Sequence, residues 1–216
     1  MEQSCIYCGS REATTRDHVP PRSFFPKPRP VNLITVPCCE DCNRIYGKDD
    51  ERVRNLITSI DKTEDHPAIQ QQIARKRDRS YTRRKGQSNY QHIIQSLRIV
   101  DRYSAVGIYL GKAPAFDLNQ KVMDRFIERM TRALLYYENG IEQAEIEIEW
   151  KKSPDQSALA KMPQRVRALL LSGQCKQIGE GIFGYVGYYT PGKAGSLWLL
   201  NFYGGIEFMS IVRETR

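Results

Sequence analysis

Two cysteine pairs near the start of the chain constrain its fold more than any other feature. Cys5 and Cys8 form one Cys-x-x-Cys pair, and Cys39 and Cys42 form a second. Four thiolates in two such pairs are a common ligand set for a tetrahedral structural zinc ion. Cys38 is adjacent, but only Cys39 has the two-residue spacing to Cys42 that lets both sulfurs reach one ion. We therefore expect Cys5, Cys8, Cys39 and Cys42 to hold one Zn²⁺ and to stabilise a small amino-terminal unit.

The cysteine distribution also indicates a reducing compartment. Five of the six cysteines lie in the first 42 residues, and Cys175 stands alone, whereas a disulfide framework spreads along the chain. The start of the chain lacks the features of a signal peptide, and no apolar run approaches the ~18 residues of a membrane span. We therefore expect a cytoplasmic protein without a membrane partner, in which Cys175 is a small core residue.

Side chains suited to a catalytic metal lie between and beside the cysteine pairs. They are Asp17 and His18, followed by Asn32 and, directly after the last cysteine, Asn43. Carboxylate and amide oxygens are hard ligands that suit Mg²⁺ or Mn²⁺. An imidazole titrates near neutral pH and can act as a general base. An isolated Asp-His pair would more often be a turn with a surface histidine, but the flanking cysteines favour a catalytic site.

Taken in this order, the residues resemble the HNH endonuclease family, also called ββα-metal nucleases, in its cysteine-bracketed zinc-containing subgroup. The resemblance covers about the first 55 residues and rests on four segments: Cys5-x-x-Cys8-Gly9, Asp17-His18-Val19-Pro20-Pro21, Asn32-Leu33 and Cys39-x-x-Cys42-Asn43. It implies two strands and a helix around metal, and hydrolysis of DNA phosphodiester bonds with structural Zn²⁺ and catalytic Mg²⁺ or Mn²⁺.

The resemblance also implies a role for each residue. His18 would take a proton from the attacking water, and Asp17 and Asn43 would bind the catalytic ion. Asn32 would hydrogen-bond backbone and fix the loop that orients His18.

Three acidic residues follow on the expected helix. Asp49, Asp50 and Glu51 could add a carboxylate to the catalytic ion, but we expect them to form a solvated acidic face instead.

The charge of the chain favours a polyanionic partner. There are 33 Lys and Arg against 25 Asp and Glu, a net charge of +8. Seven cations within a short stretch are expected to contact nucleic-acid phosphates, although such runs are usually only solvated linkers. They are Arg75, Lys76, Arg77, Arg79, Arg83, Arg84 and Lys85. No base-reading helix is visible, so we expect DNA contacts that are largely insensitive to sequence.

The pattern of the whole chain predicts an α+β fold in three parts. Residues 1–60 would be the zinc-stabilised HNH domain, 61–96 a basic helix or linker, and 97–216 an α+β domain with a mainly antiparallel sheet. Predicted helices span 42–60, 122–137 and 163–171; predicted strands span 105–110, 145–150, 181–189, 196–203 and 207–212, the last two joined at Gly204-Gly205. The aromatic residues of these strands are expected to pack in the core rather than stack on bases.

Two further readings stay open at this stage. The chain could be a zinc-stabilised nucleic-acid-binding or interaction module without free-standing nuclease activity. Alternatively, residues 97–216 could dock an ATPase or a sensor that gates the nuclease. A role in prokaryotic antiviral defence or restriction is suggested by analogy alone. The sequence does not fix the oligomeric state, although a single site of this kind cuts only one strand.

Overall fold

The first two strands and the first helix form a ββα unit. The computed structural model describes residues 3–83, 87–104, 106–117, 119–141, 145–152 and 175–215, with Gln164 and Ala168. Strand β1 (Thr15–Val19) pairs antiparallel with β2 (Ile34–Cys38). The proline-rich connection between them contains the short helix η1 (Arg22–Phe24). Helix α1 (Glu40–Ile57) follows β2 directly and begins two residues earlier than predicted, because Cys39 takes the extended N-cap position.

The middle of the chain is helical. It consists of α2 (Asp61–Glu64), the π-helix η2 (Ile69–Ile73), α3 (Ala74–Thr82) and α4 (Gln87–Ser96). Although this stretch is basic in composition, three of its apolar residues are important for packing. Ala68, Ile69 and Ile73 are buried in the hydrophobic core, so the amino-terminal part of this stretch is anchored to the body of the protein.

A two-stranded hairpin follows α4. Strand β3 (Arg98–Tyr103) pairs antiparallel with β4 (Tyr109–Ala115). The predicted strand over 105–110 was therefore wrong, since the turn falls inside it and Ala105 itself lies outside the described residues. The turn forms because the Ser104 hydroxyl accepts a hydrogen bond from the Ile108 amide at 2.9 Å, while Gly107 adopts a positive φ of 85°.

The carboxyl-terminal part contains one long helix and a five-stranded antiparallel sheet. The strands are β5 (Ile146–Lys152), β6 (Lys176–Ile178), β7 (Phe183–Tyr189), β8 (Ser196–Phe202) and β9 (Ile206–Glu214), in the order β5-β9-β8-β7-β6. This arrangement confirms the predicted α+β class with its mainly antiparallel sheet. The helix predicted over 163–171 lies outside the described residues, apart from Gln164 and Ala168.

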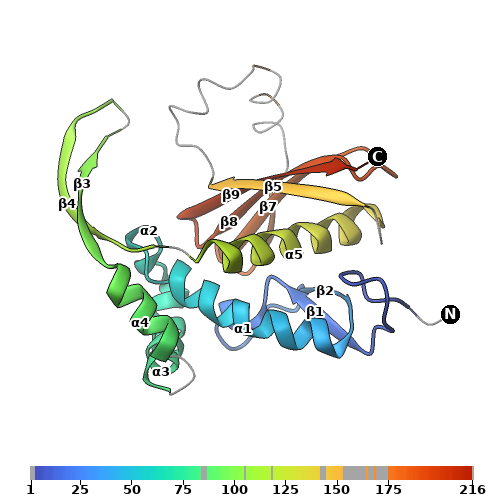
Figure 1. Cartoon of the computed structure of the whole chain (residues 1–216), viewed down its shortest axis with the longest axis horizontal. Coiled ribbons are helices and arrows are strands. Elements are labelled where there is room, and N and C mark those ends of the chain that lie inside the picture. Colours follow the sequence, from blue (N-terminus) through green and yellow to red (C-terminus); the bar gives the residue numbers. More distant parts are fainter. Residues whose placement is uncertain are drawn as a thin grey trace.

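Helix α5 (Gln120–Asn139) packs against both the amino-terminal ββα unit and the carboxyl-terminal sheet. Its start is capped by Asn119, whose side chain accepts a hydrogen bond from the Val122 amide, and its end by Gly140 with a φ of 69°. Figure 1 shows α5 lying between the sheet and α1. Its sequence explains this position, because ten of its residues are buried and apolar side chains recur on more than one face.

The hydrophobic core is continuous from the ββα unit to the sheet. Phe24 stacks on Phe126 of α5 at 5.8 Å between ring centroids and also contacts Phe202 of β8. The Tyr203 hydroxyl donates a hydrogen bond to the Phe24 carbonyl at 2.7 Å. Tyr185 and Trp198 of the strands, and Tyr203 in the turn after β8, are buried as predicted, with exposed fractions of 4%, 0% and 3%. Tyr188 and Tyr189 of β7 are only half-buried. The prediction of a buried Cys175 was wrong, since its side chain is exposed.

Candidate functional site

Four cysteines gather at the start of α1. The sulfur atoms of Cys5, Cys8, Cys39 and Cys42 all lie within 4.8 Å of one another. In a tetrahedral site with Zn–S bonds of about 2.3 Å, geometry places the sulfurs about 3.8 Å apart. The separation of Cys8 and Cys39 Sγ is 3.9 Å. The donor set and its spacing therefore fit a structural zinc ion.

The cluster resolves the choice between neighbouring cysteines. Cys39 belongs to it, as predicted, whereas Cys38 is fully buried and its thiol donates to the Cys39 carbonyl at 3.3 Å. Cys39 and Cys42 occupy the N-cap and first turn of α1. The turn after Cys5 is closed by the Gly9 amide, which donates to the Cys5 carbonyl at 2.9 Å.

An open pocket of about 470 Å³ lies along β1 and α1. It brings together Asp17, His18 and Asn43, three of the four residues predicted to be catalytic. Its lining is Arg16, Asp17, His18, Pro21, Arg22, Ser23, Arg29, Asn43, Gly47, Asp50 and Glu51. Three exposed arginines in this lining were not singled out from the sequence. Arg16, Arg22 and Arg29 give the pocket a cationic rim suited to phosphate.

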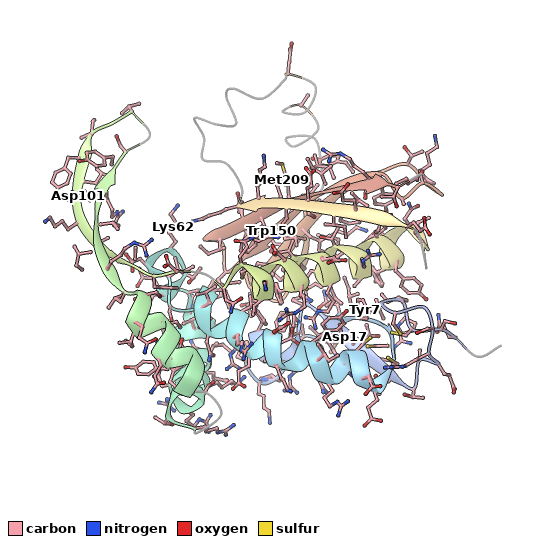
Figure 2. The ribbon with its side chains drawn as sticks, in the orientation of Figure 1. Tyr7, Asp17, Lys62, Asp101, Trp150 and Met209 are labelled. Carbon is pink, nitrogen blue, oxygen red and sulfur yellow. The ribbon has the colours of Figure 1, made fainter. Side chains whose placement is uncertain are left out.

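Asp17 is buried, and its two polar contacts both involve the same carboxylate oxygen. Its Oδ2 accepts a hydrogen bond from the Tyr7 hydroxyl at 2.7 Å and lies 3.6 Å from Nη1 of Arg129. Both contacts orient the carboxylate, and Asp17 still lines the pocket. In Figure 2, the labelled Tyr7 and Asp17 lie near the yellow sulfur atoms of the cysteines.

His18 follows on β1 and is half-buried. Burial lowers the pKa of its imidazole below the usual 6.5, the nearby Arg22 lowers it further, and Asp17 partly opposes the change. The neutral ring is therefore favoured at neutral pH. A neutral imidazole can accept a proton, which is the property that a general base requires.

Asn43 is fixed against β1 from the first turn of α1. Its amide nitrogen donates to the Thr15 hydroxyl at 3.1 Å, and that hydroxyl donates to the Cys38 carbonyl at 2.8 Å. The amide oxygen is the atom with which asparagine binds metals. The contact chain thus links the pocket to the backbone beside the cysteine cluster.

Asn32 lies elsewhere. Its side chain is exposed, and its amide nitrogen donates to the Gln177 carbonyl of β6 at 3.4 Å. The side chain does bond backbone, as the resemblance implies, but this backbone belongs to the sheet. It therefore ties the β1–β2 connection to β6.

The sequence analysis missed a buried arginine behind the pocket. Arg129 of α5 is 2% exposed, pairs with Asp50 through both terminal nitrogens and stacks over the Tyr46 ring at 4.9 Å. The signal that could have revealed it is an arginine within the apolar positions of a helix, between Ile127 and Met130.

The expected solvated acidic face on α1 was wrong for two of its three members. Asp49 is buried and accepts two hydrogen bonds from Arg125, at 2.7 and 2.9 Å. Asp50 is held by Arg129. Glu51 alone is exposed. The sequence could not show this because the partners are more than 70 residues away.

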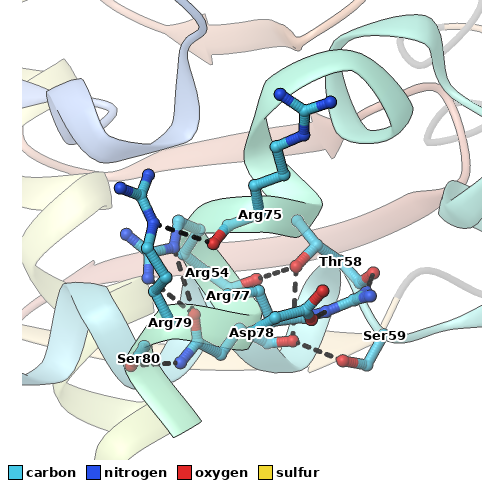
Figure 3. A network of polar contacts seen from close by, with 9 residues as sticks. Arg54, Thr58, Ser59, Arg75, Arg77, Asp78, Arg79 and Ser80 are labelled. Atoms are coloured by element: carbon cyan, nitrogen blue, oxygen red, sulfur yellow. Dashed lines mark hydrogen bonds and ion pairs between the residues drawn. The ribbon is translucent and has the colours of Figure 1, made fainter. Parts of the chain in front are cut away.

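The predicted phosphate-binding cations have mixed positions. Lys76 donates to the Phe25 carbonyl at 3.1 Å, and Arg77 donates to the Thr58 carbonyl. Both side chains therefore stabilise the fold, and Figure 3 shows the contact of Arg77 within a network around Arg54 and Thr58. The exposed members on the described surface are Arg75, Arg79 and Arg83, while Arg84 and Lys85 lie outside the described residues. Contact with nucleic acid stays a prediction.

Comparison with known proteins adds no assignment. No protein family, no curated protein and no solved structure matches the chain. Within the part of the chain that the structure describes, no helix combines the length and apolar character needed to cross a membrane.

Proposed function

We propose that this protein is a metal-dependent endonuclease of the HNH type that hydrolyses DNA phosphodiester bonds. The observation that carries the proposal is the shared lining of one open pocket by Asp17, His18 and Asn43, on a ββα unit beside four clustered cysteines. Each residue alone would be unremarkable at a protein surface. Together they supply two oxygen ligands and a base on a single accessible wall.

Each residue has a task that its position allows. Asp17 and Asn43 would hold a divalent ion such as Mg²⁺ or Mn²⁺, whose bound form stabilises charge on the scissile phosphate and the leaving oxygen. His18 takes a proton from the attacking water. Tyr7 and Arg129 hold the Asp17 carboxylate in one orientation.

The cationic rim supplies substrate binding. Arg16, Arg22 and Arg29 are exposed around the pocket and match phosphates on either side of the scissile bond. Contacts of this kind read the backbone rather than the bases, so cleavage is expected to be largely insensitive to sequence. A role in antiviral defence or restriction belongs to the same proposal and rests on analogy.

The proposal is tested on supercoiled plasmid DNA. We expect zinc-loaded wild-type protein to relax the plasmid in Mg²⁺ or Mn²⁺, and EDTA to stop the reaction. Asp17→Asn keeps the shape of the side chain but removes its charge, so it should lower the rate by about two orders of magnitude or more, the scale of a lost metal ligand or its support. Folded, zinc-loaded protein that binds plasmid and leaves it intact in every ion would instead support a binding module without catalysis.

A further inference from the structure

The hairpin of β3 and β4 stands away from the body of the protein. We call these strands, the turn between them and Leu97 the arm, which comprises the described residues 97–104 and 106–115. Figure 1 shows the arm projecting beyond α4, at the end of the molecule opposite the amino terminus. Its two strands pair only with each other among the described strands. Figure 2 labels Asp101 far from the sheet residues Trp150 and Met209.

The arm carries an unusual share of the exposed apolar surface. Of the twelve exposed large apolar side chains among the described residues, seven lie between positions 97 and 110. They are Leu97, Ile99, Tyr103, Val106, Ile108, Tyr109 and Leu110, with exposed fractions between 47% and 80%. Tyr90 and Ile94 of α4 extend this surface toward the body. Apolar side chains therefore occupy both strands of an isolated ribbon.

Such a ribbon is poorly suited to stand alone in water. An isolated two-stranded hairpin is marginally stable, and each outer edge presents unpaired backbone groups. Soluble monomers rarely expose a contiguous apolar patch larger than a few hundred Å². Summed over the ribbon, seven side chains of this size and exposure present roughly 700 to 800 Å². Exposed apolar surface on this scale is typical of an interaction site.

Charge argues against nucleic acid as that surface. The arm holds only three cations, and one of them, Arg98, is paired with Asp117 at 2.5 Å. The other two cations, Arg102 and Lys112, share the ribbon with one carboxylate, Asp101. A phosphate-binding arm needs a denser cationic stripe. The chemistry is that of an apolar protein interface with few charges.

We propose that the arm is the interface of a homodimer of this chain. A standard interface buries about 800 Å² on each partner, which is the area that one arm exposes. In a twofold dimer the same patch lies on both sides, so two arms would bury roughly 1,500 Å² and cover both patches at once. The interface would lie at the end of the molecule opposite the amino terminus, and no residue of the arm lines the proposed active-site pocket.

The mass of the full chain in solution tests this proposal. Sedimentation at increasing concentration should give twice the 25.0 kDa chain mass for the wild type. The double variant Ile99→Lys/Ile108→Lys should weaken the dimer at least ~10-fold, because it places four charges in a desolvated interface. Ile45→Lys is the matched control, since Ile45 is 53% exposed on α1, and it should dimerise like wild type. Zinc content and thermal unfolding establish that each variant is folded.

Three results would overturn the proposal. The first is a wild-type chain that stays monomeric at ~100 μM, a concentration at which even a weak dimer would form. The second is an arm variant that dimerises as tightly as wild type. The third is a dimer that Ile45→Lys weakens as much as the arm variant does. Loss of plasmid binding in a monomeric arm variant, with a monomeric wild type, would assign the arm to nucleic acid.

One consequence rests on the proposed nuclease function. A dimer holds two active sites, so it should produce linear plasmid early, whereas the arm variant should accumulate nicked circles. The two proposals fail separately: a dimer that never cuts DNA contradicts the nuclease alone, and a cutting monomer contradicts the dimer alone.

Discussion

Removal of zinc is expected to unfold the amino-terminal unit and to cost more stability than any single substitution in the core. Cys5 and Cys39 are buried among the four clustered sulfurs, and a structural zinc ion contributes about 10–16 kcal/mol to the folding of small zinc-binding units. Without the ion, the segments that carry the two cysteine pairs keep only weaker links, the hydrogen bond from the Ile6 amide to the Pro37 carbonyl and the exposed Arg11–Asp41 pair. Circular dichroism and thermal unfolding before and after chelation measure the effect, and added zinc should reverse it.

Neighbouring cysteines provide a matched pair for this prediction. Cys39→Ser should reduce bound zinc well below one ion per chain and lower the Tm. Cys38→Ala should retain the ion and lose only about 1–2 kcal/mol, the scale of a small core truncation, because Cys38 is buried outside the cluster. Zinc lost in Cys38→Ala but kept in Cys39→Ser would contradict the assignment.

Arg129→Met is expected to destabilise the protein by about 3–5 kcal/mol. The substitution removes the cation that faces Asp50 and Asp17, and both carboxylates are then left in a largely buried site without a charge partner. Urea unfolding monitored by tryptophan fluorescence measures the loss. Adding Asp50→Asn to this variant should restore part of the stability, because it removes one of the two unpaired charges.

Arg125→Met is the matched control on the same helix. Arg125 also pairs with an α1 aspartate, but its own side chain is 45% exposed. Asp49 is itself buried, but it keeps Arg52 3.9 Å away, and water reaches the Arg125 side of the pair. The loss of stability in Arg125→Met should therefore be clearly the smaller of the two. Equal losses for the two variants would show that burial of Arg129 adds nothing to its pair.

The features that the sequence predicted well depend on short-range patterns. The four-cysteine cluster was predicted from a two-residue spacing within each pair, and helix α5 from apolar positions ended by Asn139-Gly140. The strands β7, β8 and β9 follow from runs bounded by glycine. In each case the residues that decide the structure lie within one element or its cap.

The features that were missed have two different causes. Asp49 and Asp50 are predicted to be solvated, but α5 brings an arginine to each of them across 76 and 79 residues, so Asp49 is buried and Asp50 half-buried. The arm was misplaced because its apolar residues continue through a turn set by Ser104 and Gly107. The acidic pairs require knowledge of what packs alongside, whereas the turn of the arm has a local signal that the continuous apolar run obscured.

The most direct test of the proposed function is the initial rate of plasmid nicking by His18→Ala, compared with wild type and with His92→Ala in Mg²⁺. Removal of the base should lower the rate by about 10²–10⁴-fold, with zinc content, thermal stability and plasmid binding unchanged, while His92→Ala should cut like wild type. Cleavage by folded His18→Ala at the wild-type rate would contradict the active site proposed for the pocket.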